Sequence, residues 1–211
     1  MQVFSDTNST HSIGAGFPFP TPMTGGSTSV PSSAVRRGDP AQTPLTTPSV
    51  IKLDGYGDFP GLLHYSPHSV LYEDKQYPTA LHLFEACKFL PDWPDLADRV
   101  RQCQHIDQVT STSAGLANFI RPDWGNVMLS TMDEVVYLKF RQHDDLRTLL
   151  LNTYPAELVY VESGDLFWGG DGAGDGMNEL GKSLMRVRER LRSEEGTSMI
   201  NVQLYHDGRT I

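Results

Sequence analysis

The chain has 211 residues, two cysteines and a formal net charge of −9. This length is ample for one folded domain with extensions, and the acidic balance argues against general nucleic-acid binding, which requires a basic face. A nucleotide ligand is not excluded, because it needs only a local pocket.

Targeting and metal-binding signals are not found in the sequence. The N-terminal residues MQVFSDTNST lack the basic residues and the apolar run of a signal peptide, and no apolar stretch approaches the roughly 18 residues of a membrane span. Cys87 and Cys103 are too few for a disulfide framework, and neither they nor the scattered histidines have the spacing of metal ligands. We therefore expect a cytoplasmic protein, with the nucleus as the alternative location, and no membrane, metal or cofactor.

The first fifty residues differ in composition from the rest of the chain. They are rich in Ser, Thr, Pro and Gly and nearly free of charge, so they cannot bury enough apolar surface to offset the entropy of ordering. We predict a disordered arm over residues 1–50, a folded domain over 52–192 and a tail over 193–211. Within that tail, MINVQLY is a candidate strand.

The folded region begins with a hairpin and a helix. Val70, Leu71 and Tyr72 are followed by the polar turn EDKQ and then by Tyr77, which predicts two short paired strands. Thr79 is a suitable N-cap for a helix through ALHLFEACKFL. A second helical stretch, DLADRVRQC, follows.

The rest of the folded region predicts three further helices and a strand. A long helix begins after Asp123, and its apolar stripe comprises Val127, Met128, Met132, Val135, Val136 and Phe140. DDLRTLLLNT is a short helix, and residues 158–161 form a buried strand. The apolar face of the last helix comprises Leu180, Leu184, Val187 and Leu191. These elements predict an α+β fold, a compact and mostly helical single domain with a few short strands.

Four basic residues of the two long helices are expected in solvent. Lys139 and Arg141 fit a solvated helix face, with Phe140 directed inward. Arg186 and Arg188 are expected on the exposed side of the last helix, from which either could reach a phosphate.

The segment from Asp165 to Gly181, DLFWGGDGAGDGMNELG, has the composition of a ligand-binding loop. It places five glycines between Gly169 and Gly176, and such runs occur where the backbone takes positive φ or approaches a ligand closely. Asn178 is a suitable N-cap, and a helix start there would offer free N–H groups to an anion. The alternative is a mobile solvated linker, which the neighbouring Phe and Trp disfavour.

The order of several motifs along the chain gives a more specific interpretation of the loop. PTALHLFEACKF, RPDW, LKFRQHDDLRTLLLNT and DLFWGGDGAGDGMNELGKSLMRVRERL follow one another along residues 52–192. This order and spacing resemble the NADAR family, also called YbiA-like. The amino-acid sequences of the helices are most similar to those of fungal members. The resemblance implies a compact α+β fold and cleavage of an N-glycosidic bond.

The resemblance also implies the residues of the site. Its polar positions fall on His82, Lys88, Trp124, Asp165, Trp168 and Asn178. We assign catalytic roles to Asp165, Lys88, Glu85 and His82. We assign ligand-binding roles to Trp168, Gly169, Gly172, Gly174, Asn178 and Trp124.

Each assignment has a structural alternative. His82 would otherwise be a hydrogen-bonded core residue, and Trp124 would pack in the core. Asp165 would otherwise cap the loop through backbone N–H groups.

Two departures from the family mark this chain as divergent. Leu81 stands where the family usually has a catalytic Glu, and LLHYSPH replaces the family's Ser-Asn-Phe. Positions 81, 85 and 88 lie on one helix face, so we predict that Glu85 supplies the carboxylate one turn along, about 6 Å away. The alternative is that Glu85 and Lys88 form only a surface ion pair.

Three functions follow from these residues. The first is an N-glycosidase that releases a base from a ribosylated substrate, either a riboflavin-pathway intermediate or an ADP-ribosyl adduct on guanine. The second, favoured by Leu81, is a module that binds ADP-ribose or a related nucleotide without turnover. The third is a purely structural domain. The expected partner is a small ribose- or ADP-ribose-type molecule, with ADP-ribosylated nucleic acid as an alternative.

Overall fold

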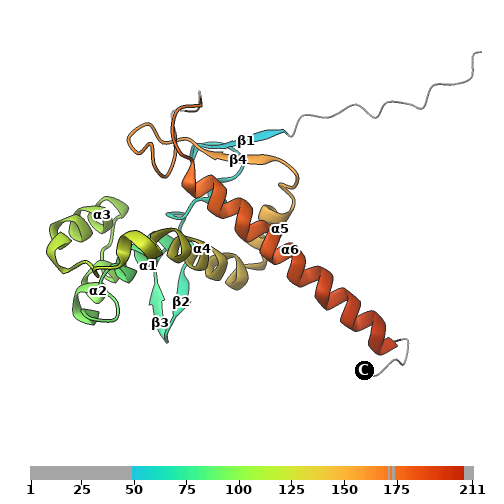
Figure 1. The fold of residues 1–211 in the computed structure, drawn as a ribbon, viewed down its shortest axis with the longest axis horizontal. Coiled ribbons are helices and arrows are strands. Elements are labelled where there is room, and N and C mark those ends of the chain that lie inside the picture. The colour runs from blue at the N-terminus through green and yellow to red at the C-terminus, as the bar shows by residue number, and fades with distance from the viewer. Residues whose placement is uncertain (1–48, 171, 173, 207–211) are drawn as a thin grey trace, which may run out of the picture. The chain divides into compact units, whose positions relative to one another are not determined.

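The structure of the protein is a computed structural model that describes residues 49–170, 172 and 174–206, with side chains as far as Thr197. The arm that we predict over residues 1–50 therefore lies, except for Ser49 and Val50, outside the described residues. Figure 1 shows the elements of the described part.

The described elements form an α+β domain dominated by helices. The strands are β1 (Val50–Leu53), β2 (Val70–Tyr72), β3 (Lys75–Tyr77) and β4 (Glu157–Tyr160). The α-helices are α1 (Ala80–Cys87), α2 (Pro94–Arg101), α3 (Ile106–Gly115), α4 (Trp124–Gln142), α5 (Asp144–Leu151) and α6 (Glu179–His206). Two 3-10 turns cover Pro60–Leu62 and Ala117–Phe119. The predicted fold class is confirmed.

The strands form two separate pairs. β2 and β3 are antiparallel, with Val70 opposite Tyr77, so the predicted hairpin is confirmed. Its turn residues Glu73 and Asp74 have φ of 45° and 59°, the left-handed pair that suits the twist of a two-residue hairpin. β1 runs parallel to β4 with Val50 opposite Glu157, and sequence patterns did not predict β1.

The two long helices supply much of the core. In α4 the buried stripe includes Met132, Val135, Val136 and Phe140, and in α6 it comprises Leu180, Leu184, Val187 and Leu191. Both predicted stripes therefore face the interior. α4 and α6 pack against each other, and α6 also packs on β4 (Figure 1).

Two of the basic residues expected in solvent are buried, so that expectation is wrong for them. Lys139 is fully buried, because it lies one turn from Val135 on the apolar stripe of α4. Its ammonium donates at 2.6 Å to each of three acceptors, the carbonyls of Gly61 and Leu63 and the hydroxyl of Ser66. Burial lowers the pKa of Lys139 to about 7.

Arg188 is the second buried cation. Its guanidinium donates to Thr153 Oγ1 at 2.8 Å and to the carbonyl of Ala156 at 2.9 Å, so it ties α6 to the segment before β4. Arg186, by contrast, is exposed and forms a bidentate pair with Asp133.

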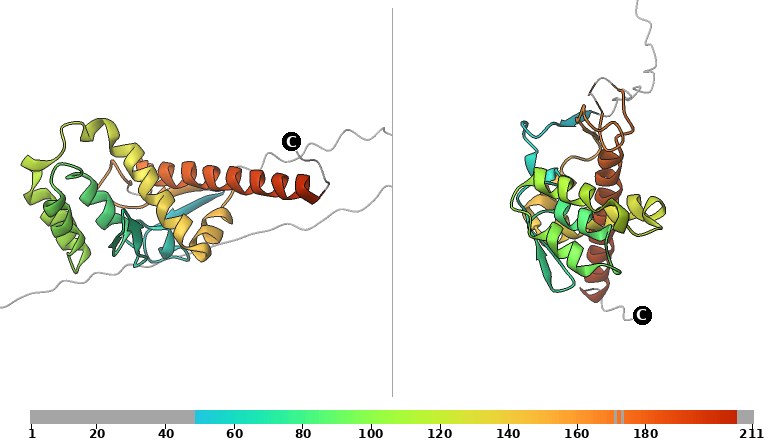
Figure 2. Two further views of the ribbon diagram at one scale, coloured as in Figure 1. Left: turned by 90° about the horizontal axis from the view of Figure 1, so that it is seen from below. Right: turned by 90° about the vertical axis from the view of Figure 1, so that its left-hand side faces the viewer.

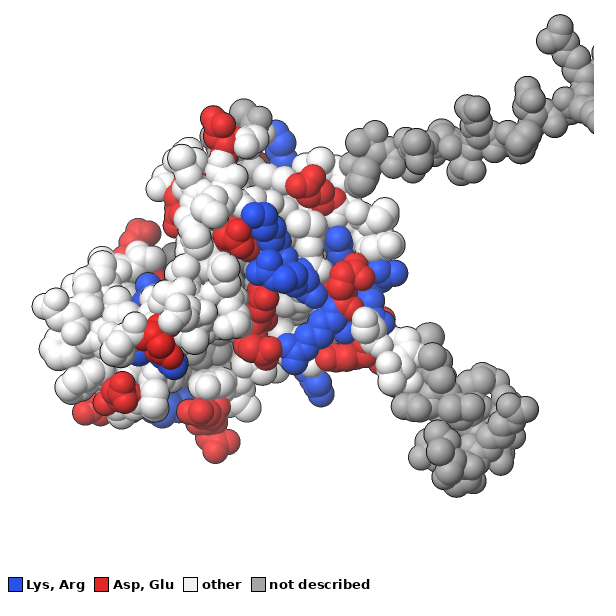
Figure 3. All heavy atoms as spheres, viewed as in Figure 1, with Lys and Arg blue, Asp and Glu red and all other residues white. Residues whose placement is uncertain are grey.

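The polar face of α6 is charged but balanced. Figure 3 shows Lys and Arg side chains gathered along α6 among Asp and Glu side chains. The ion pairs on this face are Lys182–Glu179, Arg186–Asp133, Arg190–Glu134 and Arg192–Glu189. Because each of these cations has an acidic partner, this face is not an unneutralised basic patch of the kind that binds a phosphate backbone.

α6 extends further than the sequence predicted. The helix continues from Glu179 to His206, so most of the expected tail over 193–211 is helical. The prediction of a strand over MINVQLY is therefore wrong. Residues 207–211 lie outside the described part of the chain.

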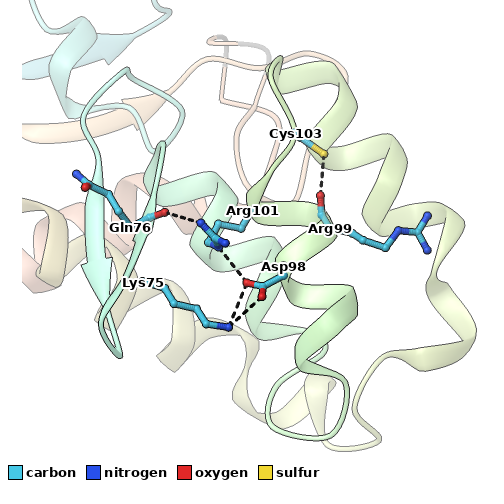
Figure 4. Close-up of polar contacts among 6 residues, drawn as sticks. All are labelled: Lys75, Gln76, Asp98, Arg99, Arg101 and Cys103. Carbon is cyan, nitrogen blue, oxygen red and sulfur yellow. Dashed lines mark hydrogen bonds and ion pairs between the residues drawn. The ribbon is translucent and has the colours of Figure 1, made fainter.

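The smaller helices form a group around α1, in which α2 and α3 pack against α1 and against each other (Figure 2). Asp98 of α2 accepts hydrogen bonds from Lys75 Nζ at 3.1 Å and from Arg101 Nε at 3.0 Å (Figure 4). Arg101 also donates to the carbonyl of Gln76 at 3.4 Å. This network attaches α2 to β3.

Candidate active site

A cavity of about 430 Å³ lies between α1, α3 and the end of β4. Its wall on α1 consists of Leu81, Phe84, Glu85 and Lys88. The opposite wall consists of Tyr160, Glu162, Asp165 and Trp168. The remaining lining residues are His64, Tyr65, Ile106, Asp107, Thr110 and Met132. Small-molecule sites in proteins span roughly 300–1,000 Å³, so the volume suits a ligand of nucleoside size.

The α1 wall follows from the start of the helix. The side chain of Thr79 accepts a hydrogen bond from the N–H of His82, as predicted for an N-cap, and this fixes the helical phase. Glu85 and Lys88 then point into the cavity and form an ion pair of 2.6 Å. Their side chains are only 8% and 19% exposed, so the pair is largely desolvated and differs from the surface pair considered as the alternative.

Leu81 lines the same cavity and is buried. Its backbone N–H donates to the carbonyl of His64 at 2.9 Å, which joins α1 to the turn before β2. The position at which the family resemblance implies a carboxylate therefore presents an apolar surface to a ligand, one turn from Glu85.

Asp165 and Trp168 stand on the opposite wall. One carboxylate oxygen of Asp165 accepts hydrogen bonds from the N–H groups of Phe167 at 3.0 Å and Trp168 at 3.1 Å. This is the capping role considered as the alternative, and it holds the loop in place. Asp165 also lines the cavity, and no hydrogen bond of its second carboxylate oxygen is found among the described residues. The Trp168 ring packs edge-on against Phe84, with centroids 5.3 Å apart.

The described glycines of the loop are not among the residues that line the cavity, and Gly169 packs against β4. A Cβ on Gly169 would lie 2.9 Å from the carbonyl oxygen of Tyr160, so no larger residue fits there. Gly170 extends the β4 pairing, accepting from the N–H of Glu162 at 2.8 Å. Gly172 and Gly174 have φ of +78° and +115°, a conformation that glycine adopts at little cost. Gly169 and Gly170 therefore attach the loop to the end of β4.

Asn178 attaches the end of the loop to β4 by hydrogen bonds. Its side-chain carbonyl accepts from the N–H of Tyr160, and its amide donates to the carbonyl of Leu158, both at 2.9 Å. The N–H groups of Glu179 and Leu180, at the start of α6, donate to carbonyls of the loop at 3.1 and 3.0 Å. The expectation that this helix start offers free N–H groups is wrong for these two residues.

His82 and Trp124 do not line the cavity. Nδ1 of His82 is 2.8 Å from Thr79 Oγ1 and Nε2 is 3.1 Å from the carbonyl of Cys103. Burial lowers the pKa of His82 below its usual value. The Trp124 ring packs against the ring of Phe84, with centroids 5.2 Å apart. Both arrangements match the structural alternatives given for these residues.

The structure adds polar residues that sequence patterns did not single out. Tyr160 and Glu162 lie two residues apart at the end of β4, with the Tyr160 hydroxyl 3.5 Å from Glu162 Oε2. Residues two apart in a strand share a face, so their position just before the predicted loop is a signal that could have identified them. Asp107 of α3 adds a further carboxylate.

His64 lies in the LLHYSPH segment, and its ring lines the cavity. Its ring lies edge-on to the Tyr160 ring at 5.9 Å, and Nδ1 is buried with no hydrogen-bond partner among the described residues. Burial, with a smaller contribution from the charge of Lys139, lowers the pKa of His64 to about 3. The imidazole is therefore neutral near neutral pH.

A second cavity, of about 610 Å³, lies on the other face of α1. Leu83 and Cys87 of α1 contribute to its floor, and charged residues at its rim are Glu73, Lys75, Arg121 and Glu134. Arg121 is held by Asp123 at 2.6 Å. The second cavity therefore has balanced charges at its rim.

Two further observations apply to the described residues only. No group of three or more His, Cys, Asp or Glu side chains among them could hold a metal ion. Within the same ranges, no helix is both long and apolar enough to cross a bilayer.

The fold and the cavity define a class: a small α+β domain with an acidic pocket walled by a helix and a glycine-rich loop. The NADAR domain family matches residues 60–192, so this chain belongs to the NADAR domain family. The predicted family membership is confirmed.

Individual relatives agree with this assignment. The chain is 34% identical over 142 residues to the N-glycosidase YbiA of Escherichia coli K12, covering 67% of this chain and 86% of the relative. It is 27% identical over 166 residues to the chloroplastic riboflavin biosynthesis protein PYRR of Zea mays, covering 72% of this chain and 27% of that protein. The NMR structure of the E. coli protein YbiA superposes with a TM-score of 0.63 at 30% identity, covering 70% and 87% of the two chains. These relatives are bacterial and plant proteins, so the likeness to fungal members stays a prediction.

Proposed function

We propose that this protein is an N-glycosidase that hydrolyses the C–N bond between a ribose and a base. The observation that carries the proposal is the convergence of Glu85, Lys88, Asp165 and Trp168, from two distant segments of the chain, on one cavity. The names of relatives as N-glycosidases and riboflavin biosynthesis proteins support a ribosylated base as substrate. An ADP-ribosyl adduct on guanine, free or in nucleic acid, is the second substrate to test.

The chemistry of this reaction suits an acidic cavity. The bond between C1′ and the base nitrogen breaks, and the base leaves with the electron pair and takes up a proton. Positive charge then builds on the sugar, and carboxylates near C1′ stabilise it. Water adds to C1′ and loses its proton to a carboxylate, which releases it to solvent in exchange for the proton that the base took from solvent, so the products are the sugar and the free base.

The lining residues support distinct roles in this reaction. Glu85 and Asp165 supply the carboxylates proposed to face C1′. Lys88 holds Glu85 in position through the 2.6 Å ion pair. Trp168 offers a flat surface on which a base can stack, since every base has a π-face.

A second candidate function is binding of a ribosyl nucleotide without turnover. Leu81 supports it, because this apolar residue occupies the cavity wall where the family resemblance implies a catalytic Glu. The two candidates differ in one observable, the release of free base.

The test is to incubate the purified protein with a ribosylaminopyrimidine phosphate and, separately, with ADP-ribosylated guanosine, and to detect free base. Release from either substrate is expected. If a ligand raises the melting temperature but no base is released, the binding module is supported and the N-glycosidase is rejected.

Variants then test the carboxylates. Glu85→Gln is expected to lower kcat about 100-fold, because general acid–base groups typically contribute 10²–10⁴-fold. The matched control is Glu134→Gln, at the rim of the second cavity. Full activity in purified Glu85→Gln would contradict the assignment of Glu85.

A further inference from the structure

His64 is a polar residue of the cavity lining that has no part in the reaction proposed above. It belongs to the turn before β2 and lines the cavity together with Tyr65 and Tyr160. The His64 ring packs edge-on against both tyrosine rings, with centroids 5.4 Å from Tyr65 and 5.9 Å from Tyr160. The orientation of the imidazole is therefore fixed by one ring of its own turn and by one ring of β4.

The backbone around His64 is also held by hydrogen bonds. The carbonyl of His64 accepts from the N–H of Leu81 at 2.9 Å, and the carbonyl of Leu63 accepts from Lys139 Nζ at 2.6 Å. These two bonds attach the turn to α1 and to α4. A side chain that is fixed in this way is preorganised, which is the condition for recognising a ligand group accurately.

The imidazole of His64 is a neutral hydrogen-bonding group with one nitrogen left for a ligand. Nδ1 is buried, with no hydrogen-bond partner among the described residues. Burial, and to a smaller extent the charge of Lys139, lowers the pKa of His64 to about 3, so the ring is uncharged at neutral pH. Because Nδ1 is covered by protein, Nε2 is the nitrogen left for a ligand, as a donor or as an acceptor according to the tautomer.

The chemistry of a neutral imidazole nitrogen favours a hydroxyl as its partner. A hydroxyl both donates and accepts, so it pairs with either tautomer, whereas a carbonyl or an ammonium suits only one of them. In a ribosylated base the hydroxyls at C2′ and C3′ belong to the sugar. The sugar is therefore the part of the proposed substrate that His64 is suited to bind.

The position of His64 relative to α1 also suits the sugar. Glu85 is proposed to face C1′, and Leu81, which bonds to the His64 carbonyl, lies one helical turn away from Glu85. One turn spans about 5.4 Å along the helix axis, a distance that a ribose ring with its hydroxyls can bridge. The base would stack on Trp168, which packs against Phe84 with ring centroids 5.3 Å apart.

We propose that Nε2 of His64 forms a hydrogen bond with a ribose hydroxyl, at C2′ or C3′, and so makes the cavity select a ribosyl substrate over its deoxyribosyl counterpart. The inference rests on the proposed N-glycosidase function and adds a specificity-determining residue to it. His64 transfers no proton in this role, because it acts only through the hydrogen bond.

The experiment is a double-mutant cycle between the side chain and the substrate. Wild type and His64→Leu are each assayed with a ribosylaminopyrimidine phosphate and with its 2′-deoxy and 3′-deoxy analogues. His64→Leu is expected to lower kcat/KM about 10-fold for the ribosyl substrate, and less than about 2-fold for the analogue that lacks the bonded hydroxyl. The cycle cancels the different intrinsic reactivity of the analogues. An equal loss with all three substrates would overturn the inference.

Two conservative variants test the assignment to Nε2. The amide introduced by His64→Gln lies at about the place of Nε2, and the amide introduced by His64→Asn lies nearer the backbone, at about the place of Nδ1. His64→Gln is expected to keep most of the preference for the ribosyl substrate, and His64→Asn is expected to lose it. The reverse order contradicts the assignment to Nε2. Melting temperatures verify that the variants compared are folded.

His105→Leu is the matched control for the removal of an imidazole. His105 is exposed and is not among the residues that line the cavity. This variant is expected to follow the wild type with all three substrates. A loss of the preference in His105→Leu would show that the preference does not report on the cavity.

Calorimetric dissociation constants for the same three compounds separate this inference from the proposed function. If the wild type releases base from none of them, the N-glycosidase is rejected for this base. A loss of affinity in His64→Leu that spares one deoxy analogue then still supports the hydrogen bond. Equal losses for all three compounds, or no binding of any of them, reject it.

Discussion

The two cavities on opposite faces of α1 differ in the balance of the charged side chains that line them. The larger one, of about 610 Å³, has balanced rim charges, and Lys75 and Arg121 are held by acidic partners outside its lining. The smaller one, of about 430 Å³, gathers four carboxylates and one ammonium from helices and loops that are distant in the sequence. Convergent polar groups, and not volume, therefore identify the candidate site.

Hydrogen bonds from side chains outside and inside the smaller cavity also fix parts of its wall. The turn that carries His64 is attached to α4 by Lys139, a buried ammonium with three acceptors. The N–H of Trp168 is likewise held by Asp165. Such fixed walls are the condition for placing catalytic groups accurately.

The largest expected effect concerns Lys139. Lys139→Met leaves three acceptors without their donor and is expected to destabilise the fold by about 3–5 kcal/mol, as when one partner of a buried charged network is removed. Urea unfolding measures the change. The control is Lys182→Met, whose exposed ion pair with Glu179 contributes about 0–1 kcal/mol. A small change in the free energy of unfolding of Lys139→Met would show that the turn that carries His64 does not depend on the buried lysine.

A second, smaller effect is expected when one aromatic residue of each cavity is replaced. Trp168→Leu keeps an apolar side chain but removes the stacking surface, so KM for a ribosylated base is expected to rise about 10-fold. Tyr72→Leu, in the second cavity, is expected to leave KM unchanged. If Tyr72→Leu raises KM and Trp168→Leu does not, the assignment of the two cavities is reversed.

The third effect is a pH dependence of stability. The pKa of His64 is about 3 in the folded protein, so an unfolded chain binds the proton first as the pH falls. Stability is therefore lost below about pH 6.5, by at most about 1.4 kcal/mol per unit.

Denaturant unfolding between about pH 7 and pH 4 tests this loss. His64→Gln is expected to lose less stability than the wild type over that window, and the exposed His105→Gln is expected to follow the wild type. Parallel curves for the wild type and His64→Gln would contradict the burial of a neutral imidazole.

Local patterns in the sequence were sufficient for most elements. The β2–β3 hairpin, the Thr79 cap and the stripes of α4 and α6 depend on residues within a few positions of one another, so periodicity reveals them. β1 was not predicted, because its four residues pair with β4, far along the chain, and follow directly on a polar segment. The site residues on α1 and the loop were reached through motif resemblance and helical spacing.

The sequence by itself predicted the hairpin and the α-helices other than α3, because these follow from short-range order, and the order of its motifs gave the family and four residues of the cavity. Only the tertiary structure decided that Lys139 is buried, that Asn178 bonds to β4, and that His82 is held by Thr79 and Cys103. It also decided that the acidic side chains of three separate segments face one another. Burial and charge around a residue are set by segments that fold against it, and no pattern along the chain carries that information.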